Sequence, residues 1–195
     1  MSNGQRFSRA WQMIVRSTIA VGLLLALLPA SPVQADDGVT RQREKAIKVA
    51  LIYNLAKFVK WPQEQSISSR FNLCIFGQNP FGDSIKILNS RTVQGRPIQL
   101  YLSDEPRQFS RCHLVFMGHP QSLQFTPQLR PHFYSPVLTV SDHPDFNLQG
   151  GMVYLGREGK RIKLTVNRSA IKRSRLTLSA QVYQLAHVVT DEFGE

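Results

Sequence analysis

Residues 72–77, NLCIFG, decide the fold, because they form a short apolar run that ends at a glycine. This pattern is typical of a β-strand that is buried on both faces. Two further runs of the same kind are CHLVFMG at residues 112–118 and PVLTVS at residues 136–141. The sequence between them predicts a helix at 81–89, a strand at 92–102 with a kink at 95–97, and a helix at 121–133. Strands that alternate with helices favour an α/β fold with a largely parallel sheet flanked by helices.

The segment before these strands predicts a long helix at residues 40–60, which contain neither Gly nor Pro. Its apolar side chains recur at spacings of three and four on two opposite sides of the helix. The first side comprises Ile47, Leu51, Asn54, Leu55 and Phe58, and the second comprises Val49, Ile52, Tyr53 and Ala56. A pattern this wide predicts burial on two sides, either under another helix or at a subunit contact.

The C-terminal part predicts a β-hairpin and a final helix. Residues 152–155 and 162–166 are apolar stretches on either side of the sequence REGK at 157–160, which is a turn signal with glycine. Residues 169–189 then place Leu178, Val182, Leu185 and Val189 in helical register. We therefore expect an antiparallel hairpin at the end of the sheet, followed by a helix.

The first 35 residues are typical of a cleavable signal peptide. Arg6, Arg9 and Arg16 precede a short apolar run, STIAVGLLLALL at 17–28, and the small and β-branched residues VQA at 33–35 provide a cleavage site. A transmembrane span needs about 20 apolar residues, so this run is too short. We expect export to the periplasm and a single domain at residues 36–195.

The expected mature chain is basic. Removal of Arg6, Arg9 and Arg16 leaves 21 basic and 13 acidic side chains, a formal charge of +8. Because an exported protein rarely meets nucleic acid, the charge favours solubility, an anionic membrane surface or an acidic partner instead. Residues 157–175 hold eight basic side chains against one acid. This segment is either a solvated hairpin and helix start or a docking face for an acidic partner or the inner membrane.

Cys74 and Cys112 are the two cysteines of the chain. An even count in an oxidising compartment indicates a disulfide, and two cysteines allow one intramolecular pairing. The bridge would close a loop of about 38 residues, for which chain entropy gives a stabilisation of roughly 4 kcal/mol. A free redox pair is the alternative, but the sequence contains no Cys-x-x-Cys.

No catalytic or metal-binding constellation stands out. Residues 77–82, GQNPFG, precede a predicted helix as a phosphate loop would, but Asp83 stands where a Walker-type loop has Lys, so a tight turn is favoured. Ser141, Asp142 and His143 cannot form a triad, because its members converge from different elements. The histidines lack the paired spacing of metal ligands. These residues indicate a binding or regulatory domain without a cofactor or metal rather than an enzyme.

Several short stretches, in order along nearly the whole mature chain, resemble the YfiR-type family of periplasmic proteins. They include YNLAKFVKWP at 53–62, LCI at 73–75, NPFG at 79–82, GRP at 95–97, CH at 112–113, GGM at 150–152, and the final LS at 178–179 and LA at 185–186. Ile47 and Leu55 stand where Ala and Phe are common in that family. Some relatives also have a second Cys pair before Gly150. This sequence lacks that pair, so the resemblance does not extend to a redox switch based on the second bridge.

The resemblance implies a periplasmic repressor that binds an inner-membrane diguanylate cyclase through the cyclase's periplasmic sensor domain. Such a protein lowers cyclic-di-GMP signalling and thereby affects biofilm formation, and an outer-membrane protein can sequester it. It also implies that Cys74 and Cys112 form the family's disulfide. Repression needs a surface, so we expect partner binding or homodimerisation through the two amphipathic helices, although core packing is the alternative for each residue. The candidate partner-binding residues are Ile52, Tyr53, Phe58, Trp61, Leu178, Val182 and Leu185.

A second hypothesis from a different class is a periplasmic small-molecule-binding module that uses the turn at residues 77–82. An exported hydrolase is a more distant third, because no nucleophile and base can be paired from the sequence.

Overall fold

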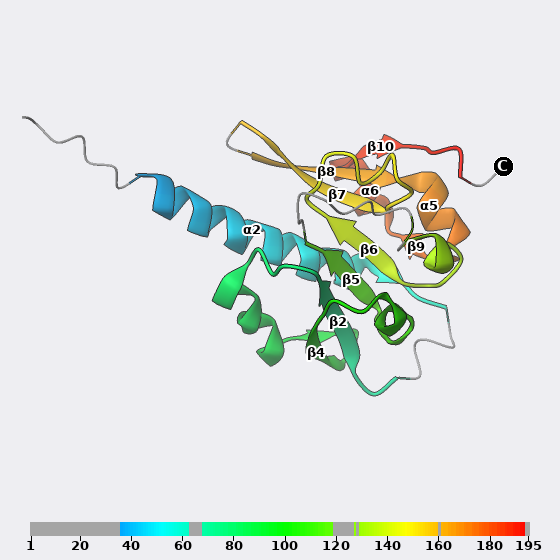
Figure 1. Cartoon of the computed structure of the whole chain (residues 1–195), viewed down its shortest axis with the longest axis horizontal. Coiled ribbons are helices and arrows are strands. Elements are labelled where there is room, and N and C mark those ends of the chain that lie inside the picture. The colour runs from blue at the N-terminus through cyan, green and yellow to red at the C-terminus, as the bar shows by residue number, and fades with distance from the viewer. Residues whose placement is uncertain (1–35, 63–67, 119–126, 128, 160, 194–195) are drawn as a thin grey trace, which may run out of the picture. The chain divides into compact units, whose positions relative to one another are not determined.

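The three apolar runs form the centre of the sheet in the computed structural model, which describes residues 36–62, 68–118, 127, 129–159 and 161–193 (Figure 1). They are the strands β2 (Phe71–Phe76), β5 (Leu114–Met117) and β6 (Leu138–Ser141). β2 pairs in parallel with β5, and β5 pairs in parallel with β6. Every side chain of these strands is buried except that of Asn72, which is half-buried. The strands predicted from apolar runs are confirmed.

The complete sheet is mixed and mostly parallel, with the order β10-β8-β7-β6-β5-β2-β4-β3. Its outer strands are β3 (Thr92–Val93), β4 (Arg96–Ser103), β7 (Val153–Glu158), β8 (Arg161–Asn167) and β10 (His187–Val189). The pairs β3–β4 and β7–β8 are antiparallel, whereas the other pairs are parallel. The α/β class is confirmed, and the prediction of a largely parallel sheet is confirmed in part.

The strand predicted at residues 92–102 is a tight hairpin instead. Val93 pairs with Arg96, so Gln94 and Gly95 form a two-residue turn. Their φ angles of 51° and 77° suit a type I′ turn, which requires positive φ at both positions. The expected kink at 95–97 is therefore wrong, because the chain reverses its direction there. The hairpin predicted between 152–155 and 162–166 is confirmed as β7 and β8.

The single final helix predicted at residues 169–189 is wrong. The segment divides into α5 (Arg168–Arg173), β9 (Thr177–Leu178), α6 (Ala180–Leu185) and β10. Arg175 has a φ of 60°, which an α-helix does not allow, and the first helix ends before it. Strand pairing then overrides the helical register, since β9 pairs with residues 59–60 near the start of the domain, and β10 pairs with β8.

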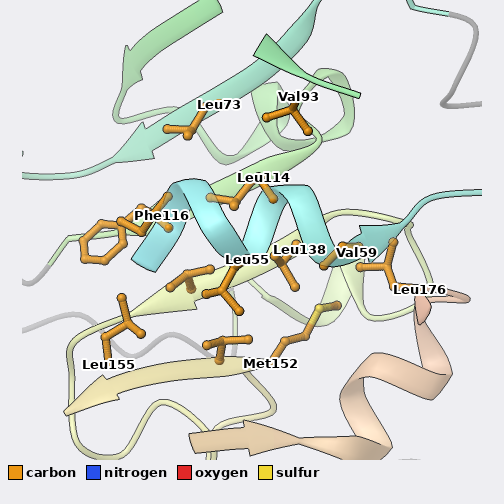
Figure 2. Close-up of a cluster of buried hydrophobic side chains, with 14 of the residues drawn as sticks. Leu55, Val59, Leu73, Val93, Leu114, Phe116, Leu138, Met152, Leu155 and Leu176 are labelled. Atoms are coloured by element: carbon orange, nitrogen blue, oxygen red, sulfur yellow. The ribbon is translucent and has the colours of Figure 1, made fainter. Parts of the chain in front are cut away.

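The helix predicted at residues 40–60 is confirmed as α2 (Asp36–Phe58). Its end differs from the prediction, because Val59 and Lys60 form β1 (Val59–Lys60) and pair antiparallel with β9. α2 packs against the sheet through its apolar side, where Leu55 lies over the side chains of the central strands (Figure 2).

In the described part of the chain, three short 3-10 helices lie between strands. The helix predicted at 81–89 is present as η1 (Gly82–Ser90), while η2 (Pro106–Arg111) was not predicted. The helix predicted at 121–133 falls largely outside the described residues, and its described end contains η3 (Arg130–His132).

The sheet separates two apolar cores. The larger core, under α2, includes Leu73, Leu114 and Leu138 (Figure 2). The smaller core includes Cys74 and Val115, and it lies on the opposite face because successive side chains of a strand alternate between faces. The predicted disulfide between Cys74 and Cys112 is confirmed in this smaller core, with the two Cα atoms 6.0 Å apart.

The signal peptide predicted at residues 1–35 lies outside the described residues, so it and the domain boundary after it stay predictions. Within the described residues, no helix is both long and apolar enough to cross a membrane.

Candidate interaction surface

α2 has one buried side and one exposed side. Val49, Ile52 and Leu55 are at most 3% exposed, because they pack on the sheet. On the other side, Ile47 and Phe58 are 38% and 40% exposed. Within the described part of the chain, the sheet covers the side of Val49 and Ile52, and Leu55, which the sequence groups with Ile47 and Phe58, is buried there as well. The second burial that the sequence predicts therefore stays a prediction for a partner or a second copy.

The exposed side of α2 forms a groove with α6, with a volume of ≈ 450 Å³. We call this the α2–α6 groove, and it is lined by Leu51, Asn54, Leu55, Phe58, Leu164, Gln181, Val182, Gln184 and Leu185. The lining is apolar apart from three side-chain amides, and none of its residues is charged. Such a lining favours an apolar occupant that also forms a few hydrogen bonds.

Backbone pairing holds α6 beside α2. The chain passes from α2 directly into β1, where Val59 pairs with Leu178 of β9. The Ser179 N–H then donates to the Phe58 carbonyl oxygen at 3.0 Å. Because α6 begins at the next residue, this short ribbon fixes the start of α6 at the end of α2.

The structure places the predicted partner-binding residues in three environments. Ile52, Trp61 and Leu178 are 0%, 7% and 4% exposed, so they contribute to the core and do not reach the surface. Tyr53 is half-buried; its hydroxyl donates to the Thr92 carbonyl oxygen, and Lys57 lies over its ring. Phe58, Val182 and Leu185 line the α2–α6 groove.

Sequence reasoning missed the remaining lining residues of the groove. Leu164 was predicted only as part of a hairpin, and Gln181 and Gln184 were placed on a long helix. Asn54 was noted on one side of α2 without a role. The exposed side of α2 could have indicated one wall of the groove. The opposite wall depends on the β1–β9 pairing, which no local sequence pattern predicts.

The stretches WP at 61–62 and CH at 112–113 meet inside the protein. The Trp61 indole N–H donates to the His113 carbonyl oxygen at 3.2 Å, and the ring of Phe71 lies beside both side chains. Arg96 lies 5.5 Å above the Phe71 ring, and burial lowers its pKa. These residues therefore have a packing role around Phe71, at the start of β2.

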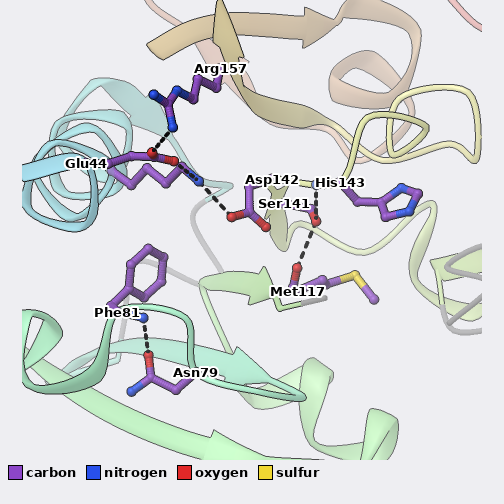
Figure 3. A network of polar contacts seen from close by, with 9 residues as sticks. Glu44, Asn79, Phe81, Met117, Ser141, Asp142, His143 and Arg157 are labelled. Atoms are coloured by element: carbon purple, nitrogen blue, oxygen red, sulfur yellow. Dashed lines mark hydrogen bonds and ion pairs between the residues drawn. The ribbon is translucent and has the colours of Figure 1, made fainter. Parts of the chain in front are cut away.

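As the sequence predicts, Ser141, Asp142 and His143 do not form a catalytic triad. The Ser141 hydroxyl donates to the Met117 carbonyl oxygen at 2.8 Å, while Asp142 lies 2.8 Å from Lys48 Nζ (Figure 3). Burial lowers the pKa of Lys48, but its hydrogen bonds to Asp142 and Glu44 outweigh this effect and leave the pKa raised. The network joins α2 to the end of β6 and has a structural role.

The turn at residues 77–82 is closed by its own contacts. The Phe81 N–H donates to Asn79 Oδ1 at 2.9 Å (Figure 3), and Asn79 Nδ2 donates to the Gly82 carbonyl oxygen at 3.2 Å. A Cβ atom at position 118 would lie 1.9 Å from the Gln78 carbonyl oxygen, so the turn packs directly on Gly118. These contacts favour the tight turn over a ligand loop.

The basic segment at 157–175 is partly neutralised by ion pairs. Arg173 forms a buried pair with Asp191, with Nη1–Oδ1 and Nη2–Oδ2 distances of 2.5 Å and 3.0 Å. Arg157 and Lys163 also lie near carboxylates, each at 3.4 Å, whereas Arg168 lies over the Tyr183 ring. The docking role of this segment stays a prediction.

The family model for YfiR/HmsC-like proteins matches residues 45–187. This chain belongs to the YfiR/HmsC-like family. The match includes α2 from residue 45 onward, the strands from β1 to β9, the first residue of β10, and α6, and therefore both walls of the groove. Membership supports a role as a periplasmic regulator of diguanylate cyclase signalling, and the family is a regulatory, non-catalytic one.

Among solved structures, the chain is similar to a conserved domain protein from Vibrio cholerae O1 biovar eltor. The two are 8% identical, with a TM-score of 0.44, and the match covers 76% of this chain and 60% of that chain. This YfiR/HmsC-like chain thus spans less than two thirds of that protein's length.

Among the described residues, no group of three or more His, Cys, Asp or Glu side chains is placed to hold a metal ion.

Proposed function

We propose that this protein binds the periplasmic part of an inner-membrane diguanylate cyclase, holds the enzyme inactive and thereby lowers cyclic-di-GMP signalling. Family membership supports the proposal. The structural observation that carries it is the α2–α6 groove, where Phe58 and Leu185 are 40% and 82% exposed beside an uncharged apolar lining. Exposed apolar patches of this kind mark contact sites on soluble proteins.

The groove suits an amphipathic helix or loop of the partner. Such a segment inserts apolar side chains at helical spacing into a groove between elements. Leu51 and Val182 provide the apolar floor, and the amides of Asn54 and Gln181 can bond polar groups at its edge. The sequence from 159 to 190 contains no Asp or Glu, so acidic side chains beside the apolar anchors would meet no like charge.

The test is a complementation experiment in a strain that lacks the chromosomal gene. Deletion is expected to raise cellular cyclic-di-GMP, and the wild-type gene should lower it again. Leu185→Ser and Phe58→Ser should fail to restore the low level, since a residue central to an interface contributes enough to weaken binding roughly tenfold or more. A pulldown should recover the cyclase with the wild type only.

Leu102→Ser is the matched control, because Leu102 is 68% exposed and belongs to β4, on the far side of the sheet order from β8. It should restore the low level fully. Unchanged cyclic-di-GMP in the deletion strain would contradict the function. Full restoration by both groove variants at normal protein levels would instead contradict the claim that the α2–α6 groove binds the cyclase.

An outer-membrane partner or a second copy of the chain would compete for the same groove. Sedimentation of the purified protein with and without Leu185→Ser separates the second case. A dimer that this substitution dissociates would show that the groove joins two copies.

A further inference from the structure

A second cavity lies on the face of the sheet opposite the groove, beneath residues 189–193, with a volume of ≈ 650 Å³. Thr165 of β8 lines this cavity, whereas the preceding residue, Leu164, lines the α2–α6 groove. We call the cavity the C-terminal pocket, and it is lined by Pro144, Asn147, Leu148, Tyr154, Thr165, Val189, Thr190, Asp191, Glu192 and Phe193.

Two polar residues of the pocket are engaged by the protein itself. Asp191 accepts hydrogen bonds from Arg173, Asn167 and the Phe193 N–H. The side chain of Asn147 donates to the Gly151 carbonyl oxygen at 3.1 Å. These contacts hold the wall of the pocket in place and leave these groups little capacity for a ligand.

The hydroxyl groups of Tyr154 and Thr165 differ from them. The two residues are directly paired across β7 and β8, so their side chains lie next to each other on the same face. Both line the pocket, and no described residue forms a hydrogen bond with either hydroxyl group. The Tyr154 hydroxyl extends over Gly156, where an added Cβ atom would lie 2.7 Å from it, so the two hydroxyls are suited to bond polar groups of a ligand that lies along this wall.

The charge of the pocket runs against that of the whole chain. None of its lining residues is Lys, Arg or His, and the exposed Glu192 adds a carboxylate at its edge. Burial raises the pKa of the Tyr154 hydroxyl; the charges of Asp142 and Asp145 act in the same direction, and the charge of Lys48 acts against them. The Glu192 carboxylate, in a lining without cationic side chains, disfavours anions and favours neutral or cationic groups.

We propose that the C-terminal pocket binds a small amphipathic molecule that is uncharged or cationic. Its apolar body packs against Leu148, Val189 and Phe193, and its hydroxyl or amine end bonds the hydroxyls of Tyr154 and Thr165. The volume lies within the range of about 300–1,000 Å³ that is usual for small-molecule sites. The proposal does not rest on the proposed repression of a cyclase.

The position of the pocket connects it to the groove. Four residues between Gln181 and Leu185 line the groove and residues 189–193 line the pocket, so a short linker that includes two residues of β10 separates the two. β8 contributes consecutive residues to both.

The test is an NMR titration of the exported chain with three probes that share a phenyl ring and a two-carbon spacer. Phenethylamine is cationic, 2-phenylethanol is neutral and 3-phenylpropionate is anionic. The first two should cause saturable shifts of the amides of Leu148, Thr165 and Phe193, and the anion should bind at least tenfold more weakly than the amine. Absence of saturation with both of the first two probes, or equal binding of the anion, overturns the proposal.

Substitutions then locate the site. Thr165→Val keeps the branched shape and should weaken phenethylamine roughly three- to tenfold, as expected for one lost hydrogen bond. Glu192→Gln should weaken the amine and leave 2-phenylethanol unchanged. Tyr154→Phe should weaken both, while Tyr134→Phe, which removes a hydroxyl from a side chain 68% exposed and outside the pocket, should weaken neither. Unchanged affinity in Tyr154→Phe and Thr165→Val together would place the probes elsewhere.

Discussion

The central strands and the C-terminal segment are held in place by different means. β2, β5 and β6 bury almost every side chain and pair along their whole length. Residues 174–193 contain only short elements, which are held in place by the pairing of β10 with β8, the β1–β9 ribbon and the Arg173–Asp191 pair. Both proposed binding surfaces lie along this second region. The sheet thus supports a segment with few buried side chains, which suits elements that must respond to partners.

The largest effect on stability is expected in the central region, at the disulfide. Replacement of Cys74 and Cys112 by Ala should lower the free energy of unfolding by roughly 4 kcal/mol, because a loop spanning 38 residues is no longer closed in the unfolded chain. Urea denaturation of the oxidised wild type and the double variant measures the difference. Reduced wild type should resemble the variant. A loss below about 1 kcal/mol would show that the bridge does not constrain the unfolded chain as argued.

The central region is also the part that the sequence predicts well. Runs such as LVFM at 114–117 need no partner to be recognised, because burial on both faces makes them apolar throughout. The disulfide follows from a count of two cysteines and the predicted compartment. Local patterns fail at Gln94, where a non-glycine residue with a φ of 51° opens a tight turn that few sequences would signal.

The next largest effect is expected at the clamp of the C-terminal segment. Asp191→Asn should lower the free energy of unfolding by roughly 3 kcal/mol, since it leaves Arg173 buried without a counter-charge. The side chains of Arg173 and Asp191 are 7% and 6% exposed. The value lies at the low end for buried pairs because Asp191 borders a pocket. Urea denaturation measures the loss, and hydrogen exchange should show residues 187–193 opening first.

Asp83→Asn is the matched control for this substitution. Asp83 and Lys86 form an ion pair whose side chains are 89% and 70% exposed, so its loss should leave stability unchanged within error. If Asp191→Asn were equally silent, the C-terminal segment would not depend on the clamp.

The same clamp predicts a dependence of stability on pH. Burial raises the pKa of Asp191, but hydrogen bonds from Arg173 and Asn167 outweigh it and leave the pKa lowered in the folded protein. Its stabilisation is therefore complete above the unfolded value of about 4 and is lost as the pH falls below it through the folded pKa. Urea midpoints between about pH 5 and pH 2.5 should fall less steeply in Asp191→Asn than in the wild type. Parallel curves would contradict this role of Asp191.

The C-terminal region shows where sequence reasoning ends. Leu178, Val182 and Leu185 have helical spacing, yet Leu178 belongs to a strand and only the other two share α6. The competing force is long-range pairing with β1, more than a hundred residues away in sequence. The sequence predicts Phe58 and Leu185 as partner-binding residues, but the two walls of the groove that they line are brought together by this pairing. The C-terminal pocket has no sequence signal, because its lining residues come from four separate segments.

The smallest effect on stability, with the clearest effect on function, is expected at Leu185. Its side chain is 82% exposed, so Leu185→Ser should change the free energy of unfolding by less than about 0.5 kcal/mol. Val182, one turn earlier in the same helix, is 6% exposed, and Val182→Ala should cost about 1–2 kcal/mol through lost packing. Urea denaturation and cyclic-di-GMP measured on both variants separate the two roles. If Leu185→Ser raises cyclic-di-GMP without loss of stability, the residue acts through a partner; if it destabilises as much as Val182→Ala, its side chain supports the fold, and loss of repression would say nothing about the groove.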